Sequence, residues 1–211
     1  MIEKIAVILI NILLEDGRIE EKNKEIYFYT MQVLVEKVIS VVFIFIFAFI
    51  WNVVLETVLF LVSFSMVRKH AGGYHAKSFR GCLIGSLGIY AIYTKYVYFF
   101  VEKHICMNFI LLVLMVVVLL IIGGVNHPNM DWSEEEYREN KRITRIVAIT
   151  EMVCISVLFY FGMGKSYILY MSFGIMLSAV LLALGKIIKQ EVSEDEEGKQ
   201  KNDALHSGEN G

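Results

Sequence analysis

Proline and cysteine are both scarce in this chain. Its 211 residues include one proline and three cysteines, Cys82, Cys106 and Cys154. An odd number of cysteines at irregular spacing makes neither a disulfide framework nor a zinc ribbon. The five histidines include no pair at the spacing of two ligands on one helix face. We therefore expect no disulfide scaffold and no bound metal, and nothing in the sequence points to a cofactor or to a nucleic-acid partner.

Charge is missing from long stretches of the sequence. Hydrophobic residues make up 56% of the chain and its mean hydropathy is +0.58, above the range of soluble globular proteins. Several windows of about 20 residues have almost no charged side chain, and this is the length that a helix needs to cross a bilayer. These windows predict an all-α integral membrane protein.

About six transmembrane helices are expected. They cover residues 33–51, 52–67, 79–100, 109–124, 146–161 and 167–188. The apolar run at 5–14 is too short to span and has no signal-peptide cleavage site after it, so it predicts a short N-terminal interfacial helix. The membrane domain is expected to cover residues 1–190. The acidic tail at 191–211 has too few apolar residues to fold, and we expect it to be disordered and cytoplasmic.

Lysine and arginine concentrate in the loops on one side of these spans. Cytoplasmic loops of membrane proteins carry an excess of both residues. The rule places both termini on the cytoplasmic side, together with the loop between the second and third spans. The basic residues on that side are Arg68, Lys69, Lys77, Arg80, Arg138, Lys141, Arg142, Arg145, Lys186 and Lys189.

The loop that begins at Arg68 contains a possible nucleophile and a possible base. A cysteine supplies a thiolate, a histidine can take its proton, and glycines let the backbone approach a substrate closely. His75 and Cys82 would be about 10 Å apart along one straight helix, too far for proton transfer, so the reading requires a bend between them. Ser78 is a suitable N-cap that would put Cys82 in the first turn of the third span. Simple alternatives remain: membrane anchoring for the basic residues, packing for the cysteine and solvent exposure for the histidine.

A second segment, residues 123–136, follows the fourth span. Pro128 ends that span, and Ser133 with Glu136 has the capping-box pattern of a short cytoplasmic helix. The segment is either a plain connection or a surface that faces the first loop and holds a peptide.

At these two segments the chain resembles the AgrB-like family, the accessory gene regulator B proteins of bacterial quorum-sensing systems. The length and the six-span outline agree as well, so the resemblance covers residues 1–190. One departure is the run Asn129, Met130 and Asp131, where family members often have lysines after the proline. The matching residues are Arg68, Gly72, Gly73, His75 and Cys82 in the first segment and Gly123, Gly124, His127, Pro128 and Asn129 in the second.

The resemblance implies a cysteine endopeptidase of the bacterial cytoplasmic membrane that acts on a small AgrD-like propeptide. His75 and Cys82 would be its catalytic pair, with Arg68, Gly72 and Gly73 as substrate-binding residues. Cleavage would remove the C-terminal part of the propeptide, and the acyl-enzyme thioester would pass to a side chain of the peptide to close a thiolactone or lactone ring. The resemblance also implies a homodimer. The small residues of the sixth span suit a close helix approach, within the chain or across a dimer; they are Ser172, Gly174, Ser178 and Ala179.

Two other functions fit a protein of this class. A small membrane transporter would need polar or charged residues deep in several spans, and residues 109–124 have no charge. A non-catalytic membrane assembly protein would not need both His75 and Cys82.

Overall fold

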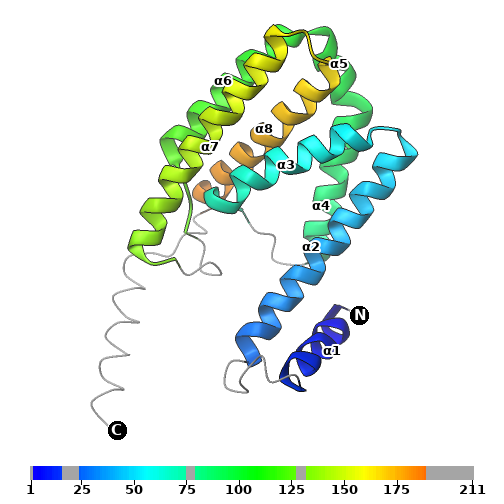
Figure 1. The fold of residues 1–211 in the computed structure, drawn as a ribbon, viewed down its shortest axis with the longest axis vertical. Helices are drawn as coiled ribbons and strands as arrows, with labels where there is room; N and C mark the ends of the chain where they lie inside the picture. Colours follow the sequence, from blue (N-terminus) through cyan, green and yellow to red (C-terminus); the bar gives the residue numbers. More distant parts are fainter. Residues whose placement is uncertain (1, 16–23, 75–78, 127–131, 189–211) are drawn as a thin grey trace. The chain divides into compact units, whose positions relative to one another are not determined.

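The computed structural model describes residues 2–15, 24–74, 79–126 and 132–188 (Figure 1). Within these residues the regular structure is helical, apart from one isolated parallel β-bridge between Gly72 and Val125. A π-helical turn, Tyr93–Val97, joins α4 to α5. The helices are α1 Ile2–Glu15, α2 Lys24–Ile50, α3 Val54–Ala71, α4 Phe79–Ile92, α5 Tyr98–Lys103, α6 Ile105–Ile122, α7 Glu134–Tyr160 and α8 Lys165–Ile187.

The predicted all-α membrane fold is confirmed. Five helical stretches of the described chain are long and apolar enough to cross a bilayer. The second expected span is also a helix, α3, but it is not among the five. Its first turn contains Glu56 and its last turn contains Arg68, Lys69 and His70, which shortens its apolar part. The five stretches are Thr30–Ile50, Gly81–Lys103, Ile105–Ile122, Glu134–Tyr160 and Lys165–Ile187.

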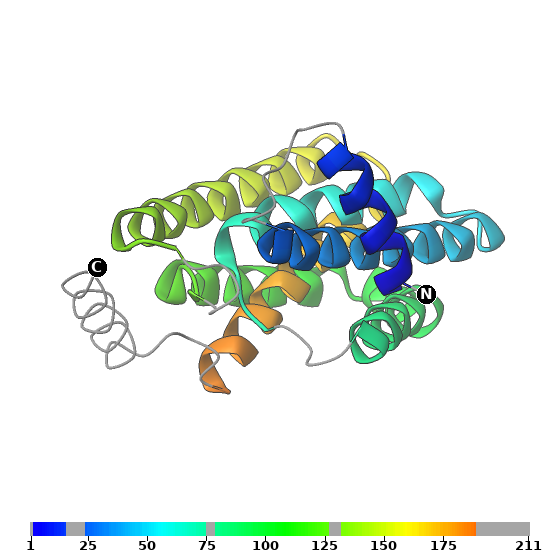
Figure 2. The same cartoon turned by 90° about the horizontal axis from the view of Figure 1, so that it is seen from below.

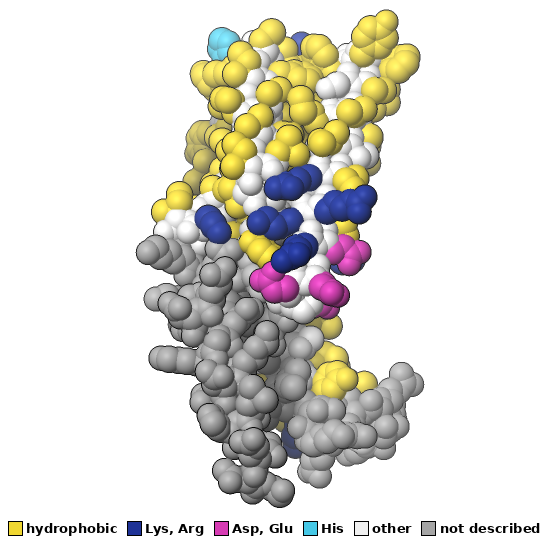
Figure 3. Space-filling model, turned by 90° about the vertical axis from the view of Figure 1, so that its left-hand side faces the viewer, with side chains coloured by type: hydrophobic (Ala, Val, Ile, Leu, Met, Phe, Trp, Pro, Cys, Tyr) yellow, Lys and Arg dark blue, Asp and Glu magenta, His cyan; other side chains and the backbone are white. Residues whose placement is uncertain are grey.

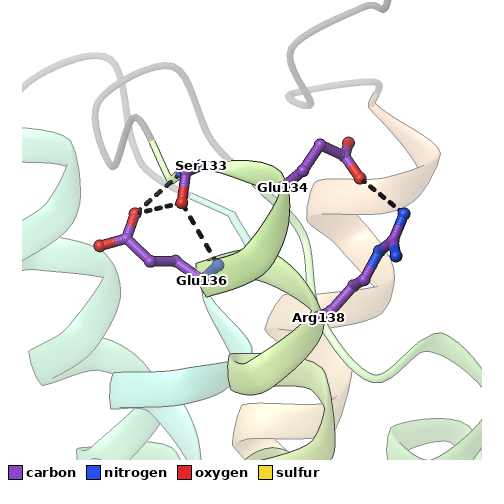
Figure 4. Close-up of polar contacts among 4 residues, drawn as sticks. All are labelled: Ser133, Glu134, Glu136 and Arg138. Atoms are coloured by element: carbon purple, nitrogen blue, oxygen red, sulfur yellow. Dashed lines mark hydrogen bonds and ion pairs between the residues drawn. The ribbon is translucent and has the colours of Figure 1, made fainter.

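Helix α7 differs from the expectation of a short cytoplasmic helix followed by a separate span. It is one continuous helix of 27 residues. The predicted capping box is present at its start: the Ser133 hydroxyl accepts from the Glu136 N–H at 3.3 Å, and the Glu136 carboxylate accepts from the Ser133 N–H at 2.9 Å (Figure 4). The charged residues of the first three turns interrupt the apolar pattern without interrupting the helix, so the pattern gave two elements where there is one.

The described chain forms two compact units. The first comprises Met1–Thr57 and Ala76–Val97, and the second comprises Val58–His75 and Tyr98–Gly211. In the first unit α2 packs against α1 and α4. The chain turns at Asn52, between α2 and α3, where this residue has a φ of 56°. Next to the turn the rings of Trp51 and Tyr90 stack 6.2 Å apart, and the Tyr90 hydroxyl lies 2.5 Å from the Thr57 hydroxyl.

The second unit has a continuous apolar core. Helices α6, α7 and α8 lie side by side around it, as the two ribbon views show (Figures 1 and 2), and the second half of α3 contributes Val67 and Ala71. The other three helices contribute Leu112, Val116, Leu119, Ala148, Ile155, Ile168, Ile175, Ala179 and Leu182, and the segment after α6 contributes Val125.

The small residues of α8 serve packing within the chain. A Cβ added to Gly174 would lie 2.8 Å from the carbonyl oxygen of Phe60 and 2.8 Å from the amide nitrogen of Phe64, so the backbones of α3 and α8 touch there. The Ser178 hydroxyl donates to the carbonyl of Phe64 at 3.2 Å. Of the two arrangements that the sequence allowed for these residues, the structure shows the intrachain one. The homodimer stays a prediction without their support.

Replacing Gly174 by alanine is expected to destabilise the second unit by about 1–3 kcal/mol, because the new methyl group would press on backbone atoms that cannot rotate away. Thermal unfolding of the purified protein in detergent measures the change. Gly88→Ala in α4 is the matched control, since a Cβ there meets nothing within 4 Å. The control should be as stable as the parent or slightly more stable. Equal stability of both variants would contradict the close approach of α3 and α8.

Candidate active site

Cys82 is the fourth residue of α4 and lies in its first turn, as predicted. The helix begins at Phe79, directly after the expected N-cap Ser78, which itself lies outside the described residues. The Cys82 thiol is free and exposed. The apolar stretch Gly81–Lys103 begins one residue before it, so the thiol is at the boundary of a candidate span. A nucleophile at this position can meet a substrate that lies at the membrane surface.

His75 lies outside the described residues, and so do His127, Pro128 and Asn129. The separation of His75 from Cys82 therefore remains the subject of a prediction. The chain that leads to His75 is described as far as Tyr74, and hydrogen bonds to other parts of the second unit define its conformation.

Arg68 and the two glycines shape this segment. The Arg68 guanidinium donates to the carbonyl oxygens of Gly72 and Tyr74 and so closes a turn after α3. Gly72 and Gly73 have φ values of 64° and 110°, in the region that side chains with a Cβ rarely adopt. These interactions give all three residues a role in the conformation of the chain. Substrate binding by Arg68, Gly72 and Gly73 stays a prediction.

Other helices of the second unit hold the same segment. The Tyr74 N–H donates to the carbonyl of Leu181 in α8 at 2.8 Å. Close contact with α8 requires Gly185, because a Cβ there would lie 2.7 Å from the amide nitrogen of Tyr74. The Val125 N–H donates to the carbonyl of Ala71 at 3.0 Å. The segment after α6 thus lies alongside the segment after α3, which confirms for the described residues that the two face each other.

The start of α7 holds both segments through side chains that sequence reasoning missed. His70 Nδ1 lies 2.8 Å from Asn140 Oδ1, and the Tyr137 hydroxyl donates to the carbonyl of Gly124 at 3.1 Å. The Lys141 ammonium lies 4.7 Å from the centre of the Tyr137 ring. None of these residues belongs to a local motif, because their partners are distant in sequence.

Two further features of the described residues bear on function. No group of three or more His, Cys, Asp or Glu side chains among them could hold a metal ion. In α7, Glu151 is buried with 7% of its surface exposed, and neither carboxylate oxygen has a hydrogen-bond partner among the described residues. Near a predicted span end this glutamate could either reach the membrane interface or pack between helices, and its burial shows that it packs within the protein.

The chain is similar in sequence to proteins of a known family. The sequence model of the family described as Accessory gene regulator B matches residues 2–182. The chain belongs to the accessory gene regulator B family. This family is involved in the processing of quorum-sensing propeptides. The predicted family is therefore confirmed over nearly the whole chain.

Two relatives from Clostridium perfringens show the same extent of similarity. An AgrB-like protein of strain SM101 / type A is 25% identical over 194 residues, which cover 86% of this chain and 87% of the relative. AgrB-like protein 2 of strain 13 / type A is 24% identical over 210 residues, which cover 91% and 96%. No solved structure matches the chain.

Arg68→Lys is expected to loosen the segment before His75. An ammonium group cannot place two donors in the fixed geometry of a guanidinium, and a hydrogen bond to a charged group contributes about 1.5–3 kcal/mol. Hydrogen exchange of the Tyr74 amide should become at least about tenfold faster. Lys69→Gln, an exposed neighbour, should leave the exchange unchanged. Unaltered protection of Tyr74 in the Arg68→Lys protein would show that this contact does not hold the segment.

Proposed function

We propose that this protein is a membrane cysteine endopeptidase that processes an AgrD-like propeptide, with Cys82 as nucleophile and His75 as general base. The observation that carries the proposal is the exposed thiol of Cys82 in the first turn of α4, at the boundary of a candidate span. Membership of the accessory gene regulator B family supplies the class of substrate.

The reaction begins when His75 takes the proton of the Cys82 thiol. The thiolate attacks the carbonyl carbon of the scissile bond, and the leaving amine receives the proton from His75. The N-terminal part of the propeptide is then held as a thioester of Cys82. A thiol or hydroxyl within the peptide attacks this thioester, which closes a thiolactone or lactone ring and frees Cys82. A site with little water favours this internal attack over hydrolysis.

The positions of basic side chains bear on which side of the membrane the site faces. Exposed basic side chains, Arg138, Arg142 and Arg145, gather between the acidic start of α7 and its apolar surface (Figure 3). Such a basic band at one end of a span is typical of the cytoplasmic side. We infer that the protein lies in the bacterial cytoplasmic membrane, with both termini and the site of Cys82 on the cytoplasmic side, and that it acts as a homodimer.

A small membrane transporter is the second candidate, because the second unit buries polar groups that lack hydrogen bonds among the described residues. They include Asn108 in α6 and Thr144 and Glu151 in α7. Buried polar residues within spans often mark pathways for ions or solutes. A transporter would keep its function without the Cys82 thiol, so the experiment below separates the two candidates.

Cys82→Ala and His75→Ala are each expected to abolish propeptide cleavage while the protein still inserts into the membrane. Cleavage is measured in cells that co-express the propeptide encoded by the adjacent small reading frame. The two losses should not add in the double variant, because the residues act as one unit. Cys106→Ala and Cys154→Ala are the controls and should remain active. Normal processing by the Cys82→Ala protein would rule out the proposed mechanism.

The loop that includes Ser78 is expected to face the cytoplasm. In a cysteine-free background, Ser78→Cys should resist an impermeant thiol reagent added to intact cells and should react after permeabilisation. Lys165→Cys, at the opposite end of the spans, should react in intact cells. Labelling of Ser78→Cys without permeabilisation would overturn the orientation and with it a cytoplasmic substrate.

A further inference from the structure

One face of α7 carries an open groove that the proposed reaction does not use. The groove has a volume of about 320 Å³, and its lining is apolar apart from the hydroxyl groups of Ser156 and Tyr160. The Ser156 hydroxyl donates to the carbonyl of Met152 at 2.8 Å, within its own helix, so it does not need a partner in the groove. The lining residues are Ile149, Met152, Val153, Ser156, Val157 and Tyr160.

The groove lies on a surface that the protein leaves uncovered. Helix α7 is long and apolar enough to cross a bilayer, and only 22% of its apolar window is buried. In the groove, Val153 is 55% exposed and Tyr160 is 84% exposed. The helix rises by about 16 Å from Ile149 to Tyr160, which is close to the thickness of the hydrocarbon in one leaflet. An extended acyl chain of a lipid can therefore lie along the groove.

Three arginines continue the same face of α7 toward its N-terminus. Arg138, Arg142 and Arg145 follow one another at intervals of four and three residues, and Ile149 comes four residues after Arg145. Residues at these intervals lie on one side of a helix. All three arginines are exposed, and basic side chains gather at this end of the apolar surface (Figure 3). A basic band that only orients the protein in the membrane would not need to be in line with a groove.

Two of these arginines are able to bind an anion at the end of the groove. Arg142 has no hydrogen bond or ion pair with another described residue. Arg145 donates from Nε to the carbonyl of Leu120 at 2.9 Å, which leaves its two terminal nitrogens without a partner among the described residues. Arg138 is paired with Glu134 at 3.5 Å. A guanidinium group can donate two parallel hydrogen bonds to a phosphate, and side chains three positions apart on a helix are neighbours.

We propose that this face of α7 binds an anionic phospholipid, with its phosphate against Arg142 and Arg145 and one acyl chain in the groove from Ile149 to Tyr160. The two arginines favour an anionic headgroup over a zwitterionic one, because the positive group of a zwitterionic lipid would lie near the same positive charges. The acidic residues of the first turn of α7 lie beyond the arginines, away from the groove. The lipid site is independent of the proposed peptidase function.

Native mass spectrometry of the full-length protein in a mild detergent measures the lipid preference. The probe is an equal mixture of phosphatidylglycerol and phosphatidylcholine with the same acyl chains. The parent should retain phosphatidylglycerol at least about tenfold more than phosphatidylcholine. Arg142→Gln should lower the affinity for phosphatidylglycerol about fivefold, and Arg142→Gln with Arg145→Gln should leave the two lipids within about twofold of each other. Lys103→Gln with Lys165→Gln, at two exposed lysines, removes the same charge and should keep the preference.

A substitution in the groove tests the place of the acyl chain. Ser156→Trp puts a large ring into the groove and should lower the retention of phosphatidylglycerol at least about threefold, because the chain loses apolar contact. Ile110→Trp is the matched control and should not change the retention. Ile110 is 62% exposed on α6 and follows Phe109, whose ring centre lies 4.7 Å from that of Phe159, so the added ring lies at a similar level of the spans. Thermal unfolding in detergent shows whether each variant folds.

Equal retention of the two lipids by the parent, an unchanged preference in the arginine variants or the same loss in the lysine control would each overturn the headgroup site. Unaltered retention by Ser156→Trp would overturn the place of the acyl chain. A dimer that loses its partner in Ser156→Trp, without a lipid preference in the parent, would show that a second copy of the chain covers this face instead. If the double variant does not fold because Arg145 no longer binds Leu120, Arg142→Gln alone decides, since Arg142 makes no such bond.

Discussion

Buried backbone groups beyond the end of a helix must find hydrogen-bond partners within the protein, because burial removes them from water. The short stretch from Ala71 to Tyr74 at the end of α3 meets this requirement through hydrogen bonds to other parts of the second unit. Arg68 binds two of its carbonyl groups, Val125 binds a third, and Leu181 accepts its amide hydrogen. The need to satisfy this stretch explains why a charged arginine, a neighbouring loop and a distant helix all converge there. The same contacts hold the chain directly before the residue that we assign as the general base.

Helix α8 is the element that organises the second unit. Gly174 and Ser178 bring it against α3, and Leu181 and Gly185 bring it against the stretch before His75. It is also the most buried of the candidate spans, with 61% of its apolar window inside the protein. A span with so little lipid contact is apolar for packing as much as for insertion. This explains why its small residues, which also suit an interface between subunits, are occupied within one chain.

The fold was predictable from the sequence where the signal is local. Runs without charge located the spans, Ser133 with Glu136 located the start of α7, and Ser78 located the start of α4 one residue later. The continuity of α7 was missed because the charged residues from Arg138 to Arg145 interrupt the apolar pattern, as a loop would. Arginine and lysine are nevertheless good helix formers, so the helix continues through them. The contacts of His70 with Asn140 and of Tyr74 with Leu181 join residues about 70 and 107 positions apart. Pairs so far apart produce no periodic pattern in the sequence. The candidate site residues could therefore be predicted from their motif, but the groups that hold the segment before His75 could not.

The contact between Tyr74 and Leu181 also has a consequence for the order in which the protein matures. The ribosome produces the segment before His75 long before it produces α8, and membrane insertion follows the same order. Until Leu181 and Gly185 have entered the bilayer, the amide of Tyr74 lacks its acceptor and the segment lacks the helix against which Gly73 and Tyr74 pack. A nascent chain that ends before α8 thus contains residues 72–74 without the acceptor that holds Tyr74. The segment before His75 is therefore expected to reach its final conformation only when the last helix is in place.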